Sequence, residues 1–293
     1  MSGALKEVRN RIKSVQSTQQ ITKAMKMVSA AKLRRAQDAI TQMRPYAAKL
    51  QEMLSNIVSN TEGETGGSLA TERPIGKVLL IVITSDRGLA GAYNANIIKL
   101  ARQTVRERYA SQQAAGNVHI WTIGKKGYEQ LSKGSYKVNA AYKDIFLSLN
   151  FDSVQACAQA VVKAFQNKEF DVVELVYSEF RNAATQLFSV ERFLPIPKIG
   201  APAGAKKSDF IFEPNKEQLI AELMPKILNT QLYKAVLDAN ASEHGARMTA
   251  MDKASENANE LLRSLKISYN RARQAAITTE LSEIVSGAAA LQG

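Results

Sequence analysis

Hydrophobic positions repeat every three or four residues near both ends of the chain. Neither Gly nor Pro occurs between Gly3 and Pro45 or between Gly245 and Gly287, so each stretch can form one long helix. One heptad register runs through the first stretch and has two seam positions. The first seam position contains Leu5, Ile12, Gln19, Lys26, Leu33, Ile40, Ala47 and Leu54. The second contains Val8, Val15, Thr22, Ser29, Ala36, Met43, Leu50 and Ile57. A matching register in the last stretch contains Met248, Met251, Ser255, Ala258, Leu262, Leu265, Tyr269, Ala272, Ala276 and Thr279.

The simplest arrangement of two such seams is an intramolecular antiparallel coiled coil. Two alternatives remain open at this point. Each helix could pack on the central part of the chain, or it could dimerise with another copy.

The central region alternates between strand and helix patterns. Residues 77–84 form a continuous apolar, β-branched run that is typical of a buried parallel strand. The pattern further predicts strands at 117–123, 171–177 and 185–193, the last two paired, and helices at 92–111, 124–131 and 154–165. This order predicts an α/β fold with a small, Rossmann-like, mostly parallel sheet. Residues 61–72 and 200–208 are expected to be loops, which gives domains at 1–60, 74–200 and 213–293.

The charge of the chain is strongly basic and concentrated near its start. The 293 residues include 39 Lys and Arg against 27 Asp and Glu, a net charge of +12. Residues 1–50 contain eleven basic residues and only two acidic ones, Glu7 and Asp38. Because Tyr46 is the only aromatic residue there, base stacking on nucleic acid is not favoured, and the expected partner is an acidic surface, such as one on a protein.

Several functional classes are not expected. The single cysteine, Cys157, excludes a disulfide scaffold and is predicted to be a core thiol. The turn after the first strand has Gly88 and Gly91 but lacks the third glycine of a dinucleotide fingerprint, so a nucleotide-binding enzyme is disfavoured. His119 and His244 show no metal-ligand spacing. We therefore predict no catalytic site, cofactor or metal.

The longest apolar run, 78–83, is too short to span a membrane, and the N-terminus has no apolar signal core, so an intracellular protein is expected.

The C-terminal end of the last predicted helix has the opposite character. No charged side chain follows Glu283. A helix that is apolar on all sides needs burial, which a single partner helix cannot provide. We expect another molecule to surround this end.

Three segments, 11–34, 84–91 and 272–289, resemble the gamma subunit of F-type ATP synthase in the same order along the chain. Ile277, Thr278, Glu280, Glu283, Gly287 and Ala288 stand at the fixed positions of the C-terminal signature of that family. The resemblance implies a non-catalytic rotor subunit. Its helices would turn inside a ring of alpha and beta subunits, while the sheet domain and an epsilon subunit would sit on the membrane c ring and couple proton flow to ATP synthesis.

The resemblance also implies contact residues and a cellular setting. Arg273, Gln274, Thr278 and Glu280 would meet a catch loop of beta, and Met25 and Lys26 would face acidic lever segments of beta. Residues 209–213 resemble the foot segment near the c ring, with Glu213 as the polar contact. The polar seam stretch 19–29 coincides with the Met25 region, so its residues need not all pack in the seam. With only Cys157 and no regulatory cysteine insertion, a bacterial enzyme on the cytoplasmic face of the cell membrane is expected rather than a chloroplast one.

Overall fold

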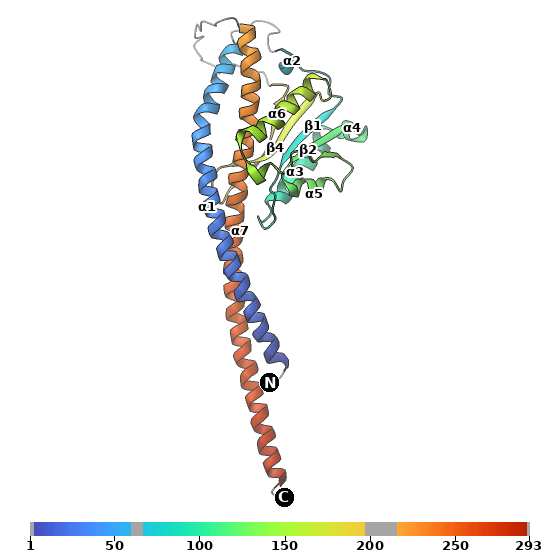
Figure 1. The fold of residues 1–293 in the computed structure, drawn as a ribbon. Coiled ribbons are helices and arrows are strands. Elements are labelled where there is room, and N and C mark those ends of the chain that lie inside the picture. The colour runs from blue at the N-terminus through green and yellow to red at the C-terminus, as the bar shows by residue number, and fades with distance from the viewer. Residues whose placement is uncertain (1–2, 60–66, 197–215, 292–293) are drawn as a thin grey trace. The chain divides into compact units, whose positions relative to one another are not determined.

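The computed structural model describes residues 3–59, 67–196 and 216–291. The chain divides into two compact units, one formed by residues 1–29 with 248–293 and the other by residues 30–247. Two long helices, α1 (Gly3–Ser59) and α7 (Lys216–Leu291), contribute to both units (Figure 1). The predicted α/β class, with long terminal helices and a mostly parallel sheet, is confirmed. The predicted loop 200–208 lies outside the described residues.

The larger unit is built on a five-stranded sheet with the order β3-β2-β1-β4-β5. The strands are β1 (Val78–Ile83), β2 (Val118–Ile123), β3 (Lys137–Asn139), β4 (Val172–Phe180) and β5 (Gln186–Leu194). The pairs β3–β2, β2–β1 and β1–β4 are parallel, and β5 joins the edge antiparallel to β4. All six side chains of β1 are buried, as expected for a central strand that is covered on both faces.

Helices cover the two faces of this sheet. Val78, Leu80 and Val82 share a core with α3 (Tyr93–Arg108). The alternate residues Leu79, Ile81 and Ile83 share a second core with α6 (Phe151–Gln166). The remaining short helices are α2 (Gly67–Ala70), α4 (Ala110–Ala114), α5 (Lys125–Leu131) and the 3-10 helix η1 (Ile145–Ser148).

Two of these small elements differ from the sequence prediction. Helix α2 lies within the predicted loop 61–72, where Leu69 is buried in the core. Strand β3 was not predicted, because its three residues are exposed or half-buried and carry no hydrophobic run. Both elements owe their conformation to packing or pairing with the main sheet unit rather than to a local pattern.

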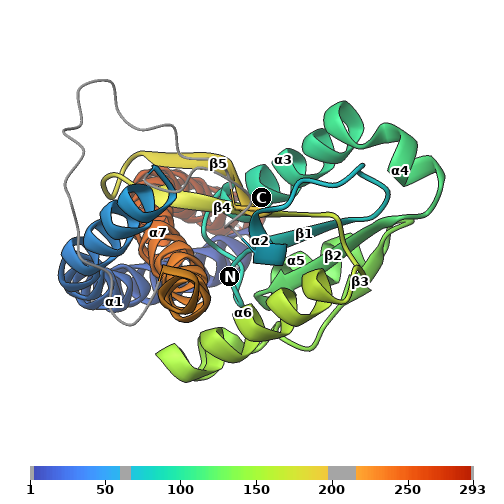
Figure 2. The ribbon, with the colours of Figure 1, turned by 90° about the horizontal axis from the view of Figure 1, so that it is seen from above.

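The first half of α7 packs against the sheet. Met224, Leu228, Leu232 and Val236 belong to the same core as α6. Figure 2 shows this part of α7 running beside β4 and β5. Further along, Gly245 brings the helix close to the β4–β5 turn, where a Cβ would lie 3.2 Å from Ala183 Cα. The hydrophobic pattern of residues 216–247 did not predict this packing.

The smaller unit is an antiparallel pair of helices. Its cross-helix contacts join Arg9 to Tyr269, Gln19 to Asn259, Thr22 to Ser255 and Lys26 to Asp252, so residue numbers rise in one helix as they fall in the other. Every described seam position that the sequence predicts on α1 is buried or half-buried, and so are those on α7 except Thr279. The predicted intramolecular coiled coil is confirmed.

The polar part of this coiled-coil seam is packed. The sequence left open whether all of the polar seam residues between 19 and 29 pack, and in the structure Thr22 and Ser29 are only 8% and 2% exposed, while Gln19 and Lys26 are half-buried. Three polar pairs cross the seam: the Thr22 and Ser255 hydroxyls lie 2.7 Å apart, Gln19 donates to Asn259, and Lys26 Nζ lies 2.5 Å from Asp252 Oδ1. Polar residues can occupy a seam when each meets a partner that satisfies it.

Candidate partner-binding surfaces

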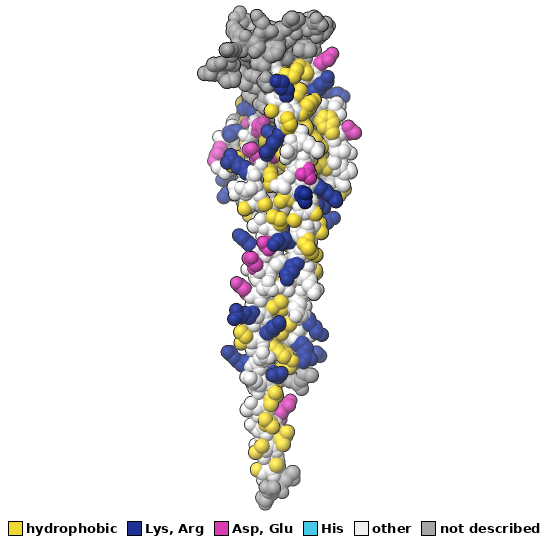
Figure 3. Space-filling model, turned by 90° about the vertical axis from the view of Figure 1, so that its left-hand side faces the viewer, with side chains coloured by type: hydrophobic (Ala, Val, Ile, Leu, Met, Phe, Trp, Pro, Cys, Tyr) yellow, Lys and Arg dark blue, Asp and Glu magenta, His cyan; other side chains and the backbone are white. Residues whose placement is uncertain are grey.

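The end of α7 carries hydrophobic side chains that the chain itself does not cover. Ile277, Leu281, Ile284 and Val285 are 48%, 57%, 68% and 67% exposed. Figure 3 shows hydrophobic side chains gathered along this last part of α7 and basic ones around the coiled coil. Fully burying a side chain of this size contributes about 1.5–3 kcal/mol. An apolar socket around this end would therefore be strongly stabilising.

The four residues that the family resemblance assigns to the catch loop of beta all lie on this exposed end. Arg273, Gln274, Thr278 and Glu280 are exposed, and Thr278 Oγ1 donates to the Gln274 carbonyl at 3.0 Å. Because residues three and four apart are neighbours on a helix, their polar groups lie next to the exposed apolar side chains. The surface therefore offers donors, acceptors and apolar area together.

Met25 and Lys26 are both half-buried in the coiled coil. The Lys26 ammonium forms an ion pair with Asp252 of the same chain, so part of its charge is already neutralised before any partner binds. The neighbouring surface of α1 instead exposes Ile21, Met27 and Val28, at 56%, 68% and 56%. Sequence reasoning missed these apolar residues, although Ile21 and Val28 share one heptad position outside the seam and so give a readable signal.

The turn after β1 is held by the chain's own groups. The guanidinium of Arg247 on α7 donates through Nη2 to the Arg87 carbonyl at 3.0 Å and to the Gly88 carbonyl at 3.2 Å. Its other partner is the Glu243 carboxylate, and burial raises the pKa of Glu243 while Arg247 lowers it. The turn presents Leu89, with φ 63° and 66% exposed, to the outside. Nucleotides bind at the carboxyl ends of strands in such sheets, and here this turn anchors α7 instead.

Cys157 and His244 are buried, and His119 on β2 is half-buried. Cys157 is fully buried on α6, and burial raises the pKa of its thiol to about 12. His244 is 8% exposed, and burial, Arg247 and Lys32 lower its pKa to about 4, so the ring is neutral at pH 7. Within the described part of the chain, no group of three or more His, Cys, Asp or Glu is placed to hold a metal ion.

Two further sequence expectations concern the membrane side. Glu213 and the segment 209–213 lie outside the described residues. Among residues 3–59, 67–196 and 216–291, no helix has the length and apolar character needed to cross a membrane.

The chain is similar in sequence to one family over nearly its whole length. A family model of ATP synthase matches residues 4–291. The ATP synthase gamma chain of Cytophaga hutchinsonii is 53% identical over 291 residues, covering 98% of this chain and 99% of the relative. The ATP synthase gamma chain of Chlorobaculum tepidum is 50% identical over 288 residues, with 98% and 99% coverage.

Solved structures show the same fold. The central stalk and c-ring structure of the Tetrahymena thermophila mitochondrial ATP synthase contains a chain with 26% identity and a TM-score of 0.56, covering 80% of this chain and 99% of that one. A chain in the Euglena gracilis mitochondrial ATP synthase has a TM-score of 0.68 at 20% identity, with 99% and 95% coverage.

Proposed function

We propose that this chain, which belongs to the ATP synthase gamma chain family, is the central rotating shaft of a proton-translocating F-type ATP synthase. The observation that carries the proposal is the end of α7, whose apolar side chains from Ile277 to Val285 are exposed on a continuous helix. Such an end requires a surrounding partner. In this proposal a ring of alpha and beta subunits supplies it.

The exposed end of α7 suits a bearing. Hydrophobic contact scales with buried area and has little directional preference, so an apolar end in an apolar socket can turn without locking at one angle. The neighbouring Arg273, Gln274, Thr278 and Glu280 add directional hydrogen bonds, by which the shaft and a loop of beta act on one another.

A second contact with beta would lie around Met25 and Lys26 on the coiled coil. Lys26 is paired with Asp252, so its positive charge would be shared between Asp252 and an acidic segment of beta. The exposed Ile21, Met27 and Val28 add apolar contact area. Exposed ion pairs contribute about 0–1 kcal/mol each, so a contact made of several such pairs can push a lever and release it.

The sheet domain would form the foot of the shaft. In this proposal it binds an epsilon subunit and the membrane ring of c subunits, with Glu213 as a polar contact to the ring. The support is the family membership and the resemblance of residues 209–213 to the foot segment of that family. The chain would then be a peripheral membrane protein on the cytoplasmic side of a bacterial cell membrane.

The chain would act as a non-catalytic subunit. Rotation of the c ring by proton flow would turn the shaft, and the shaft would drive each beta subunit in turn through substrate binding, ATP formation and release. No nucleotide or nucleic acid is proposed as a ligand, because Arg247 holds the turn after β1 and the basic coiled coil offers few aromatic side chains.

A reconstituted complex tests this function through the residues assigned to the catch loop of beta. We expect the combined substitutions Arg273→Ala, Gln274→Ala and Thr278→Ala to lower ATP synthesis and coupled proton pumping by about tenfold or more, because the lost charge-assisted and polar contacts together cost at least about 1.4 kcal/mol. All three side chains are exposed, so the free energy of unfolding of the isolated chain should change little.

The matched control replaces three other exposed polar residues of α7, Arg263→Ala, Ser264→Ala and Asn270→Ala. These should leave synthesis near the wild-type rate. Wild-type synthesis and coupling in the first variant would contradict the assigned contact residues.

A further inference from the structure

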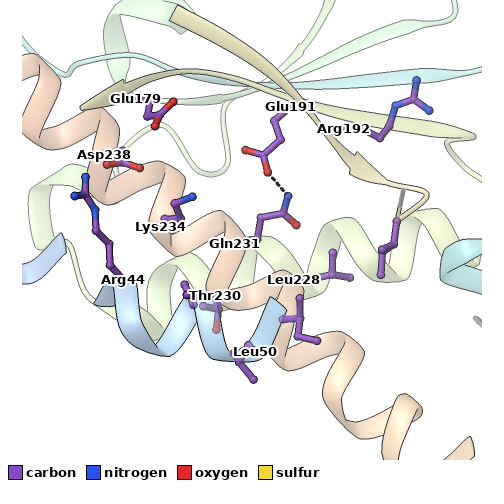
Figure 4. Close-up of a pocket in the computed structure, with 14 residues that line it drawn as sticks. Arg44, Leu50, Glu179, Glu191, Arg192, Leu228, Thr230, Gln231, Lys234 and Asp238 are labelled. Carbon is purple, nitrogen blue, oxygen red and sulfur yellow. Dashed lines mark hydrogen bonds between the residues drawn. The ribbon is translucent and has the colours of Figure 1, made fainter. Parts of the chain in front are cut away.

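A pocket of about 600 Å³ lies within the unit of residues 30–247, between α1, α7 and the β4–β5 edge of the sheet. Its volume falls in the range of small-molecule sites, roughly 300–1,000 Å³. Figure 4 shows its two different ends. Arg44, Glu179 and Asp238 point toward one another at one end, and Leu50 and Leu228 lie at the other.

Asp238 gives the polar end an unmet requirement. Its side chain is 2% exposed, and its Oδ1 accepts no hydrogen bond from any described residue. Burial raises the pKa of this carboxyl to about 6, while Lys234, Arg44 and the Phe180 N–H oppose that shift and Glu179 reinforces it. At pH 7 the group is therefore mostly an ionised carboxylate with a free acceptor. Buried acceptors of this kind are normally satisfied.

The free acceptor of Asp238 favours a donor that carries a positive charge. Glu179, Glu191 and Asp238 line the pocket together with Arg44, Lys234 and Arg192, so its carboxylates and cations are equal in number, and Asp238 Oδ1 still lacks a donor. Glu191 accepts from Tyr177 OH at 2.8 Å and from Gln231 Nε2 at 2.6 Å, so its oxygens are already satisfied.

Arg192, the third cation of the lining, does not supply the donor that Asp238 lacks. It lies toward the apolar end, and its Nε is 3.6 Å from Glu174 Oε1. Its charge is therefore directed at Glu174 rather than at the carboxylates of the polar end.

The other end of the pocket suits hydrocarbon. Leu50, Ile196, Ile227 and Leu228 line it and are at most 9% exposed. A ligand with a cationic donor at one end and a short apolar chain at the other would match both ends at once.

We propose that this pocket binds a small primary amine with a short hydrocarbon chain, whose ammonium group donates to Asp238 Oδ1 and whose chain extends toward the apolar end formed by Leu50 and Leu228. This binding site goes beyond the proposed rotor function and does not depend on it. The ammonium supplies the donor that the Asp238 carboxylate lacks, and the chain displaces water from the apolar wall.

Isothermal titration of the purified full-length chain with hexylammonium chloride at pH 7.5 tests the site. We expect saturable binding with a dissociation constant of roughly millimolar order, as is usual for a ligand of this size. Hexanoate should not saturate, because it brings a second negative charge to Asp238. Methylammonium should bind at least about tenfold more weakly, because it lacks the hydrocarbon chain.

Two variants locate the binding. Asp238→Asn should weaken hexylammonium binding by about tenfold or more, and Ala48→Phe should weaken it by filling the pocket from the exposed face of α1. Asp38→Asn, which makes the same charge change at an exposed position of α1, should bind like wild type. Absence of saturable binding to the wild-type chain, or equal binding to wild type and Asp238→Asn, would overturn the proposal.

Discussion

A buried carboxylate has lost its water and needs protein donors in its place, and Asp238 on α7 has a donor for only part of its acceptor capacity. The Phe180 N–H stabilises the charged form, as do the positive charges of Lys234 and Arg44. Desolvation is the larger effect, and the pKa of the carboxyl rises from 3.8 to about 6. The folded state therefore binds a proton more readily than the unfolded chain does.

The stability of the chain should consequently depend on pH at this residue. Between the unfolded pKa near 3.8 and the folded pKa near 6, Asp238 is protonated in the folded chain and ionised in the unfolded one, so its contribution to stability is lost as pH rises. Asp238→Asn removes this loss. We expect the stabilising effect of the substitution, measured by urea unfolding, to be about 1–2 kcal/mol larger at pH 8 than at pH 5.

The exposed Asp38→Asn variant should show no such difference between the two pH values. An equal effect of Asp238→Asn at pH 5 and pH 8 would mean that the carboxyl is not desolvated in solution.

At the scale of the element, the coiled coil combines apolar layers with three adjacent polar pairs. Each polar group removed from water needs a partner across the seam, and a shift of one heptad would separate Gln19 from Asn259, Thr22 from Ser255 and Lys26 from Asp252. Apolar residues would tolerate such a shift more easily. The polar pairs therefore favour one register of the two helices.

A double-mutant cycle on Thr22 and Ser255 tests this pairing. Each single change to Val leaves one hydroxyl without its cross-helix partner, which should lower the free energy of unfolding by about 1–2 kcal/mol. The double variant should lose less than the sum, with a coupling of about 0.5–1.5 kcal/mol, because it removes both hydroxyls together. Thermal and urea unfolding of the full chain provide the measurement. Strictly additive losses would show that the two hydroxyls do not interact.

The sequence predicted those elements that carry their own pattern. The heptads of α1 and the apolar run of β1 were recognised because every described seam position and every β1 side chain faces the interior at least in part. The packing of α7 residues 216–247 was missed, because that segment lies outside the long stretch without Gly or Pro and contains Pro225. The pairing of Lys26 with Asp252 was also missed, since a partner some 230 residues away leaves no local signal.

At the scale of the whole molecule, the two ends of α7 differ in what they need. The first part is buried in the core of the sheet unit by residues such as Leu228 and Leu232, which are 0% exposed. The last part exposes Ile284 and Val285 and is not covered by the described residues. The stability of the free chain and the stability of its assembly therefore depend on different residues.

The combined change Ile284→Asp and Val285→Asp separates these two dependencies. In the isolated chain we expect the free energy of unfolding to stay within about 0.5 kcal/mol of wild type, because both side chains are already exposed. In the reconstituted ATP synthase, burying two carboxylates in an apolar socket should lower the thermal stability of the complex and its turnover. Thermal unfolding of the free chain and of the complex gives both values. A large loss of stability in the isolated chain would contradict the exposed position of these residues.

The burial of Cys157 has a practical consequence for watching such a molecule move. The chain has one thiol, it is inaccessible on α6, and its pKa near 12 keeps it from forming the reactive thiolate at neutral pH. A cysteine introduced at any exposed position could thus receive a fluorophore or a bead linker selectively, with no native residue to remove first. A label attached to such an introduced cysteine would therefore report on that one position alone.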